Sequence, residues 1–474
     1  MLQGTRMKNP QTNSEIGYDD CFDIIVMGGG PSGAHAALAA SRAGNKVLLV
    51  EKHGFLGGSL TAMGVGPMMS FHNPAGTQVV AGQAEELVQR LMAKNASPGH
   101  IPDSVTYCST VTPFDSEALK VELESMITEA GGVILYHTHL AAAETDASGC
   151  RATHVALCNK AGLRNYRAEV FIDATGDGDL CVALGAPFAK GRDGDHAMQP
   201  MTMNMKVGSV DMEAIRQDVF DRSDDFEFDL GIEEGLRRLR ETPRVSLKAY
   251  TRTWKQAKER GEVNVPREFV LFFETSTPGV VIVNTSRIQG LDGTNPYDLT
   301  KAEMEGRRQN QEIFRFLKTH CRGFERAIRV DSAAQIGVRE TRRIMGLYTL
   351  TADDLLQEKA FPDPIALGGY PIDIHSPDKA ETISDHLAED TRYQIPMRSL
   401  LMEKPENVIV AGRCLSATHE AMAAIRVSPI AMAIGQAAGV MAATAVATSL
   451  PANQVEYALV RRALLTGKAL LPSD

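Results

Sequence analysis

Short runs of large apolar residues alternate with longer amphipathic stretches along this chain. The first apolar run, at residues 24–26, precedes several glycines and an alanine-rich stretch at 34–43, and a second run covers 47–50. Short β-branched runs predict buried strands, and the alanine-rich stretch predicts a helix. The chain therefore opens with a predicted strand–helix–strand unit of a parallel sheet.

The same pattern predicts further elements up to residue 194. Apolar residues at helical spacing predict helices at 83–94 and 116–130. Short strands separated by turns then predict a small β-meander. Its strands are expected at 133–136, 139–144, 152–158 and 167–172.

Residues from about 195 onward carry more charge, and they lack a nucleotide-binding motif. Strands are predicted at 267–274 and 280–284, and a long amphipathic helix at 300–317. The arginine-rich stretch 338–348 is interpreted as a solvated helix face. This part of the chain is expected to be an inserted lobe that closes over a substrate.

The last part returns to the first pattern, with a buried strand at 407–410, a loop at 414–425 and a helix from 430. The apolar stretch 431–450 is rich in Ala and Gly and contains Gln436, so we expect a buried core helix rather than a membrane span. The domain organisation predicted from these shifts is a loose tail, two parts of one domain and an insertion between them. The expected ranges are 1–20, 21–194, 195–395 and 396–474.

Composition narrows the function classes. The chain has 474 residues and a net charge of −10, which argues against a nucleic-acid partner, and no polybasic run suggests a membrane surface. Seven cysteines without a C-x-x-C pair fit a reducing cytoplasm. We therefore expect a cytoplasmic protein without nucleic-acid or membrane partners.

The chemistry-bearing motif lies between the first two predicted strands. Gly28, Gly30 and Gly33 stand at G-x-G-x-x-G spacing, and Glu51 ends the second strand. The glycines permit a tight turn, close approach of a pyrophosphate and close helix–strand packing, while the helix N-terminus offers free N–H groups. An acidic residue in the position of Glu51 can accept hydrogen bonds from a ribose. Together they predict a dinucleotide-binding site.

Acidic residues also cluster with glycine in the segment 173–179. Asp177 and Asp179 could be metal ligands, but the later acidic positions of a calcium loop are missing. No metal is expected.

The motif order resembles that of the FAD-dependent oxidoreductases with a glutathione-reductase-type fold. The segments that carry the resemblance are GGGPSG, EKxGFLGGSLT, IDATGDGD, RxTRRIxG, IPMRSLL and VIVAGRCLSATHEAMAAIRVSP. Within that family the chain looks most similar to the flavoprotein group of fumarate reductase and succinate dehydrogenase. The resemblance implies an α/β fold, with a Rossmann-like FAD-binding domain built of a parallel sheet, helices and a β-meander, plus an inserted α+β cap or substrate lobe.

The resemblance also implies which residues bind FAD. Leu140 is expected to meet adenine through its backbone, and Arg413 stands where the family often has an acidic residue, so it would reach the phosphates as a cation. Ser59 and Leu60 occupy the place of the histidine that carries covalent FAD in succinate dehydrogenases, so non-covalent FAD is expected. The full predicted set is Gly28, Gly30, Pro31, Ser32, Gly33, Glu51, Lys52, Gly57, Gly58, Ser59, Thr61, Leu140, Thr175, Gly176, Asp177, Gly412, Arg413, Ser428 and Pro429.

Catalytic residues are sought where the lobe would meet the flavin. His419, in the predicted loop, suits proton transfer near neutral pH, although a structural role is nearly as well supported. Arg426 could bind a substrate carboxylate or form a salt bridge with Glu420. Arg339 and Arg398 are weaker candidates as anion anchors. Arg342 and Arg343 are expected to face solvent, and His72, His375 and Ser428 are peripheral.

Two functions remain open from the sequence. The first is an FAD enzyme that oxidises or reduces a small polar, anionic metabolite by hydride transfer. The second is a flavin-binding electron-transfer or sensor subunit of a larger complex, without its own small substrate. A single dinucleotide fingerprint argues against a second NAD(P)H site, so the flavin would exchange electrons with small substrates, oxygen or a redox partner protein.

Overall fold

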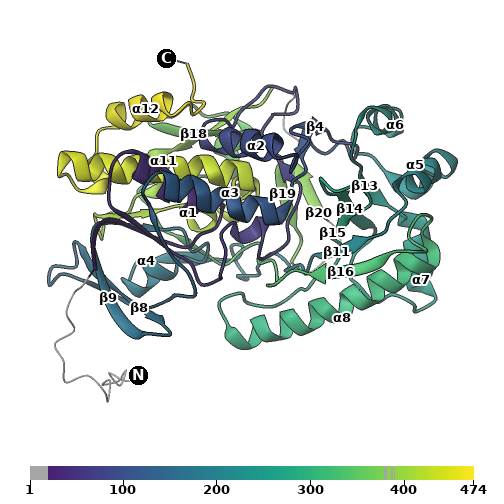
Figure 1. The fold of residues 1–474 in the computed structure, drawn as a ribbon, viewed down its shortest axis with the longest axis horizontal. Coiled ribbons are helices and arrows are strands. Elements are labelled where there is room, and N and C mark those ends of the chain that lie inside the picture. The colour runs from purple at the N-terminus through teal and green to yellow at the C-terminus, as the bar shows by residue number, and fades with distance from the viewer. Residues whose placement is uncertain (1–19, 378–381, 386–387, 389, 474) are drawn as a thin grey trace.

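A seven-stranded sheet forms the centre of the protein (Figure 1). The structure is a computed structural model that describes residues 20–377, 382–385, 388 and 390–473. The predicted loose tail at 1–20 lies almost entirely outside the described residues. The strands of this sheet are β1 (Asp20–Met27), β2 (Val47–Val50), β6 (Val133–Leu135), β7 (His139–Thr145), β8 (Ala152–Asn159), β9 (Gly162–Asp173) and β22 (Val408–Val410).

The sheet has a parallel part and an antiparallel part that share one long strand. The strands β6, β2, β1, β9 and β22 run parallel. The strands β7 and β8 pair antiparallel with each other, and β8 pairs with β9. The prediction that 133–136 belongs to the meander is therefore wrong, since β6 pairs with β2 in the parallel sheet. The other predicted meander strands are confirmed.

Two helices with small side chains pack on this sheet and on each other. They are α1 (Pro31–Arg42) and α11 (Ser428–Thr448), and they lie side by side in Figure 1. A Cβ atom added at Gly435 would lie 2.0 Å from the Ser32 backbone oxygen, and one at Gly439 would lie 2.2 Å from that of Ala36. The two backbones therefore meet directly, which requires glycine at both positions.

The helix α11 is long and apolar enough to cross a membrane, yet 72% of its apolar window is buried inside the protein. Close packing against α1 accounts for its alanine and glycine content. The prediction of a buried core helix is confirmed. Further helices of this part are α2 (Gln83–Ala93), α3 (Ser116–Glu129), α4 (Asp179–Ala183), α10 (His419–Ile425) and α12 (Tyr457–Thr466).

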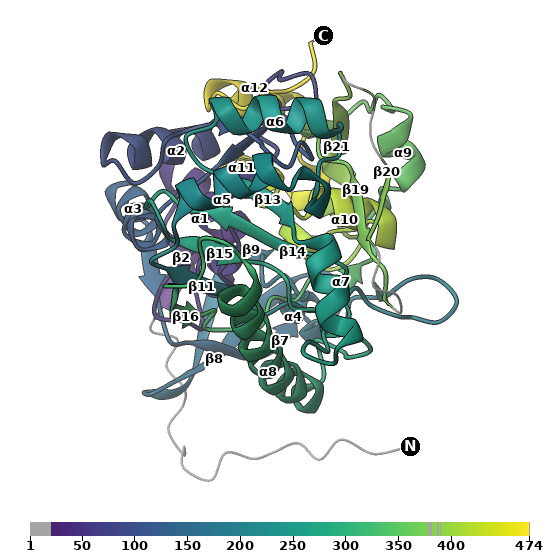
Figure 2. The same cartoon turned by 90° about the vertical axis from the view of Figure 1, so that its right-hand side faces the viewer.

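A second sheet lies in the lobe at the right of Figure 1, with four helices around it (Figure 2). Its antiparallel strands follow the order β12-β13-β14-β15-β11-β16. They are β11 (Met205–Gly208), β12 (Phe226–Glu227), β13 (Ser246–Ala249), β14 (Val270–Glu274), β15 (Val281–Val283) and β16 (Ile328–Ser332). The helices are α5 (Met212–Asp221), α6 (Ile232–Glu241), α7 (Thr251–Glu259) and α8 (Pro296–His320). The predicted α+β lobe is confirmed, with a core of its own that includes Trp254, Phe272 and Phe316.

Four small sheets of two or three strands lie beside the two large ones in the part of the chain that the structure describes. They are β3 (Met68–Met69), β4 (Ile101–Pro102) and β5 (Thr110–Thr112); β10 (Phe188–Lys190) with β17 (Arg342–Ile344); β18 (Pro364–Gly368) with β21 (Tyr393–Pro396); and β19 (Ile372–His375) with β20 (Thr382–Asp385). A short helix, α9 (Ala352–Leu356), precedes β18. Several residues between 344 and 395 join the core of the first part, for example Leu350, Ile365 and Tyr393. The domain limits at 195 and 395 stay predictions.

Two local predictions in this region are wrong. The arginine-rich stretch 338–348 contains strand β17 rather than a solvated helix, and Arg343 is buried because its guanidinium pairs with Glu340. The stretch 414–425 is not only a loop, because Thr418 caps helix α10 by accepting a hydrogen bond from the Ala421 backbone. Long-range contacts decide both stretches, because β17 pairs with β10 and His419 at the start of α10 pairs with Glu340.

Candidate functional site

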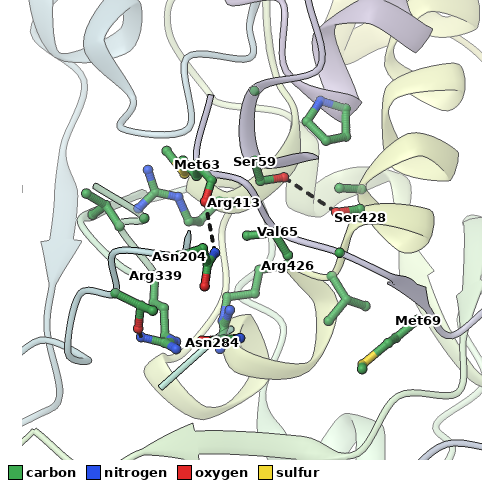
Figure 3. A pocket seen from close by; sticks show the side chains of 18 of the residues that line it. Ser59, Met63, Val65, Met69, Asn204, Asn284, Arg339, Arg413, Arg426 and Ser428 are labelled. Carbon is green, nitrogen blue, oxygen red and sulfur yellow. Dashed lines mark hydrogen bonds between the residues drawn. The ribbon is translucent and has the colours of Figure 1, made fainter. Parts of the chain in front are cut away.

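A cavity of about 640 Å³ lies between the two parts of the protein. Its walls come from the glycine loop after β1, the turn after β9, the start of α11, the lobe sheet and the segment 370–375. Figure 3 shows Ser59 and Ser428 at one side of this pocket and Arg339 and Asn284 at the other. The two sides differ in chemistry and are described in turn.

The glycine loop forms the floor of the first side. Gly28 has a φ of +97°, which suits glycine, and a Cβ at Gly33 would lie 1.8 Å from the Gly28 carbonyl oxygen. A Cβ at Gly30 would meet only the Gly58 Cα, at 4.0 Å, so the space in front of Gly30 is open. Gly30 is also the N-cap residue of α1, where the first N–H groups of the helix are exposed to the cavity. This is the geometry that a pyrophosphate requires.

Glu51 lies at the end of β2 and is held there by backbone groups. Its two carboxylate oxygens accept hydrogen bonds from the backbone N–H of Gly29 (2.7 Å) and of His53 (2.8 Å). The side chain is buried and lines the cavity. The carboxylate is thus fixed beside the glycine loop, and each oxygen has a second lone pair left for a ribose hydroxyl.

Arg413 and Asp177 close the same side from two other loops. Arg413 Nη2 donates to Asp177 Oδ1 at 2.6 Å, and a Cβ at Gly176 would lie 3.2 Å from Arg413 Nη2. The buried Arg413 Nη1 and the buried Ser32 Oγ have no hydrogen-bond partner among the described residues. Both residues line the cavity. An unpaired guanidinium nitrogen, a hydroxyl and an open glycine fit the phosphates of FAD.

The hydroxyl groups of Ser59 and Ser428 meet 3.4 Å apart at the start of α11 (Figure 3). Most of the predicted FAD-binding residues line the cavity. These are Gly28, Gly30, Pro31, Ser32, Glu51, Lys52, Gly58, Ser59, Thr175, Gly176, Asp177, Gly412, Arg413 and Ser428.

Five predicted FAD-binding residues do not line the cavity. Gly33 and Gly57 allow close backbone packing, and Thr61 Oγ1 donates to the Leu56 carbonyl at 2.7 Å. Leu140 lies in β7 opposite Leu157, and Pro429 sits in the first turn of α11. The direct FAD contacts predicted for these five residues stay predictions, because none of the five lines the cavity.

His419, the first catalytic candidate, also lies outside the cavity wall. It begins α10, and its Nδ1 lies 2.8 Å from the carboxylate of Glu340. Glu340 is fully buried, pairs with Arg343 and accepts from the Gln199 backbone N–H at 3.1 Å. His419 is thus held by Glu340 and does not line the cavity, and its catalytic role stays a prediction.

Arg398 is likewise outside the cavity. Its guanidinium pairs with Asp363 at 3.0 Å, and its side chain is 42% exposed. Arg398 is therefore paired with Asp363 away from this cavity, and its role as an anion anchor stays a prediction. Asp179, considered as a metal ligand, pairs with Arg342 at 2.8 Å.

Arg339 and Arg426 line the second side of the cavity. Arg339 Nη1 donates to the Pro200 carbonyl and to Thr202 Oγ1, both at 2.6 Å. Arg426 Nη2 lies 3.9 Å from Asp373 Oδ2, and the predicted alternative, a bridge to Glu420, is not formed. Figure 3 shows both arginines entering from different elements.

Sequence reasoning missed two residues beside these arginines and set a third aside as peripheral. Arg267 is buried in the same wall, and Asp373 and His375 project from β19. His375 Nε2 lies 3.3 Å from Asp373 Oδ2. Nothing in the local sequence distinguishes Arg267 from other arginines of the lobe, because only the tertiary fold brings it to the same cavity as Asp373 and His375.

Burial and like charge shape the electrostatics of this side. Burial lowers the pKa of Arg339 well below its usual range, and Arg426 and Arg267 lower it further. Burial also lowers the pKa of Arg267, to about 10, and that of His375, which is therefore neutral. Burial alone would raise the pKa of Asp373, but a hydrogen bond from His375 and the charges of Arg426 and Arg339 lower it, so Asp373 is ionised. Three guanidinium groups thus converge near Asp373, with Glu268 beside Arg267, and their positive charge favours an anionic ligand.

Comparison with known proteins gives a family-level match. The model of the family described as FAD dependent oxidoreductase matches residues 23–464. A soluble pyridine nucleotide transhydrogenase of Vibrio cholerae is 24% identical over 172 residues, 34% of this chain and 32% of that protein. A digeranylgeranylglycerophospholipid reductase of Methanoculleus marisnigri is 29% identical over 159 residues, 33% of this chain and 38% of that protein. The matches thus cover about a third of these curated relatives.

Solved structures were compared as well. A geranylgeranyl bacteriochlorophyll reductase-like protein of Thermoplasma acidophilum aligns with a TM-score of 0.46 and 12% identity. The alignment covers 95% of this chain and 83% of that structure.

Proposed function

Because this chain belongs to the FAD-dependent oxidoreductase family, we propose that it transfers hydride between non-covalently bound FAD and a small anionic metabolite. The observation that carries the proposal is the convergence of three guanidinium groups at the second side of the cavity. Arg267, Arg339 and Arg426 line it together with Asp373, whose side chain is 13% exposed, and with Glu268, the neighbour of Arg267 in sequence. We call these three arginines the anion end of the cavity.

The first side of the cavity supports the cofactor part of the proposal. Gly30 and Ser32 offer space and a hydroxyl to the phosphates, Arg413 offers a positive charge, and Glu51 offers acceptors to the ribose. When bound, FAD supplies a ring that accepts or donates hydride. Non-covalent attachment is proposed because Ser59 and Leu60 stand where succinate dehydrogenases carry the linking histidine.

The anion end supports the substrate part of the proposal. The buried Nε atoms of Arg267 and Arg426 have no hydrogen-bond partner among the described residues. Burying such a donor is costly unless a ligand accepts from it, and a carboxylate can accept from a guanidinium in a bidentate way. Arg339 is fixed by Thr202, so it would hold the ligand in one orientation. The anion end would thus bind and orient the substrate.

The finer likeness to the fumarate reductase and succinate dehydrogenase group is part of this proposal and rests on the sequence motifs. The alternative function, an electron-transfer or sensor subunit, would need no anion end. A redox partner protein and a cytoplasmic location stay predictions.

The proposal is tested with carboxylic acids and a matched pair of variants. The FAD-loaded protein is titrated with a panel of carboxylates by calorimetry, and the flavin absorbance is followed under anaerobic conditions. Arg426→Lys loses the planar fork, so we expect affinity to fall about 10- to 100-fold, the loss of one or two charge-assisted hydrogen bonds. Arg398→Lys, outside the cavity, is the control and should bind as the wild type does.

FAD content is measured in both variants to confirm that the site is intact. Equal carboxylate affinity in Arg426→Lys and the wild type would contradict the anion end. If no acid in the panel binds or changes the flavin absorbance, the electron-transfer alternative replaces the proposal.

A further inference from the structure

We propose that the substrate carries an aromatic ring next to its anionic group. This inference rests on the proposed function, because it names the substrate class for the same site. Of the aromatic residues that line the cavity, Tyr107, Phe269 and Tyr370 are connected by their contacts to the anion end. We call them the aromatic wall.

The aromatic wall is assembled from three separate segments. Tyr107 lies between β4 and β5, Phe269 directly precedes β14, and Tyr370 directly precedes β19. The rings of Tyr107 and Tyr370 have centroids 5.6 Å apart at 66°, an edge-to-face pair. Such a pair prefers further rings at its edges and faces over aliphatic groups of the same area.

Each end of the wall touches the anion end. The guanidinium of Arg267 lies 4.8 Å from the centroid of Phe269. The hydroxyl of Tyr370 lies 3.5 Å from Asp373 Oδ2, which is 3.9 Å from Arg426 Nη2. A ligand whose carboxylate meets the arginines therefore has its body against the aromatic wall.

Lys248 lies near two rings of the aromatic wall, and its ammonium group is already paired with a carboxylate. Lys248 Nζ lies 5.2 Å from the centroid of Tyr107 and 5.9 Å from that of Phe269. It is paired with both carboxylate oxygens of Asp229, at 2.6 and 2.8 Å. The ammonium group is thus a cation–π partner of the wall, and its pairing with Asp229 leaves binding of the anionic group to the three arginines.

These residues are separate from those that fit the cofactor. The phosphate and ribose side is built from the glycine loop, the turn after β9 and the residues at 412–413. The aromatic wall comes from the segments before β5, β14 and β19. The wall and the anion end together fit a single carboxylate joined to a planar ring, rather than an acid with two carboxylates and no ring.

The test compares two acids of equal charge and similar size. Phenylacetate and cyclohexylacetate are titrated into the FAD-loaded protein by calorimetry, with succinate as a ring-free acid. We expect phenylacetate to bind about 2- to 10-fold more tightly than cyclohexylacetate, the contribution of one aromatic contact. Phe269→Leu and Tyr107→Leu should reduce this ratio towards one, while Phe188→Leu, at an exposed position outside the cavity, should preserve it.

Circular dichroism and FAD content show whether each variant is folded. Equal affinity for the two ring acids in the wild type, or tighter binding of succinate, would overturn the aromatic inference and leave the proposed function in place. Failure of all three acids to bind would overturn both. An unchanged ratio in folded Phe269→Leu and Tyr107→Leu would also refute the aromatic wall.

Discussion

Substitution of Gly30 tests the cofactor site without disturbing the protein that surrounds it. Gly30 has φ −69° and ψ −174°, a conformation that any residue can adopt. A Cβ there meets only the Gly58 Cα at 4.0 Å, so Gly30→Val should leave the free energy of unfolding of the apoprotein nearly unchanged. The branched side chain would instead fill the space that the phosphates need.

The expected loss can be estimated from the hydrogen bonds at stake. Each hydrogen bond to a charged group contributes about 1.5–3 kcal/mol, so losing two of them weakens FAD binding by about 10²–10⁴-fold. At a FAD concentration 100 times the wild-type Kd, bound FAD stabilises the native state by about 2.7 kcal/mol. For a chain of this length that corresponds to a Tm rise of about 3 °C, which Gly30→Val should abolish.

The assay measures FAD affinity by fluorescence titration and Tm by differential scanning calorimetry, with and without FAD. Gly33→Ala is the contrasting variant, because its Cβ would lie 1.8 Å from the Gly28 carbonyl oxygen. It should lower the Tm of the apoprotein itself. Wild-type FAD affinity in Gly30→Val would refute the assignment of this loop to the phosphates.

Three further predictions follow from buried charges. Arg413→Gln removes a cation from the phosphate side and should weaken FAD binding about 10- to 100-fold with a reduced salt dependence, and an unchanged Kd would contradict that role. Burial lowers the pKa of His35 to about 4, so on acidification the unfolded chain takes up a proton at this residue before the native protein does. The free energy of unfolding should therefore fall by about 3 kcal/mol between pH 6.5 and pH 4. His35→Leu should flatten this part of a Tm–pH profile, and a retained slope would show that His35 does not cause the fall. Glu340→Ala leaves Arg343 and His419 buried without their carboxylate partner, so the free energy of unfolding measured in urea should fall by about 3–5 kcal/mol. Asp221→Ala removes one partner of an exposed pair and should lower it by less than about 1 kcal/mol. Equal losses in these two variants would contradict the Glu340 network.

Local sequence determined the nucleotide-binding half of this protein. The apolar runs before Gly28 and Glu51 can only be buried in a sheet, and Gly28 and Gly33 stand where a side chain would strike the backbone. The alanine and glycine content of α11 likewise predicted a core helix, because small residues allow two helix backbones to pack closely. These features depend on residue spacing within one or two elements, so they can be predicted from the sequence.

The tertiary structure alone decided the substrate side. His419 and Arg398 are ordinary polar residues in sequence, and the carboxylates of Glu340 and Asp363, from other segments, pair with them outside the cavity. Arg267, Asp373 and the aromatic wall lie far apart along the chain and meet only where the lobe packs against the segment 370–375. A charge placed in a low-dielectric interior must have a partner, and long-range packing chooses that partner.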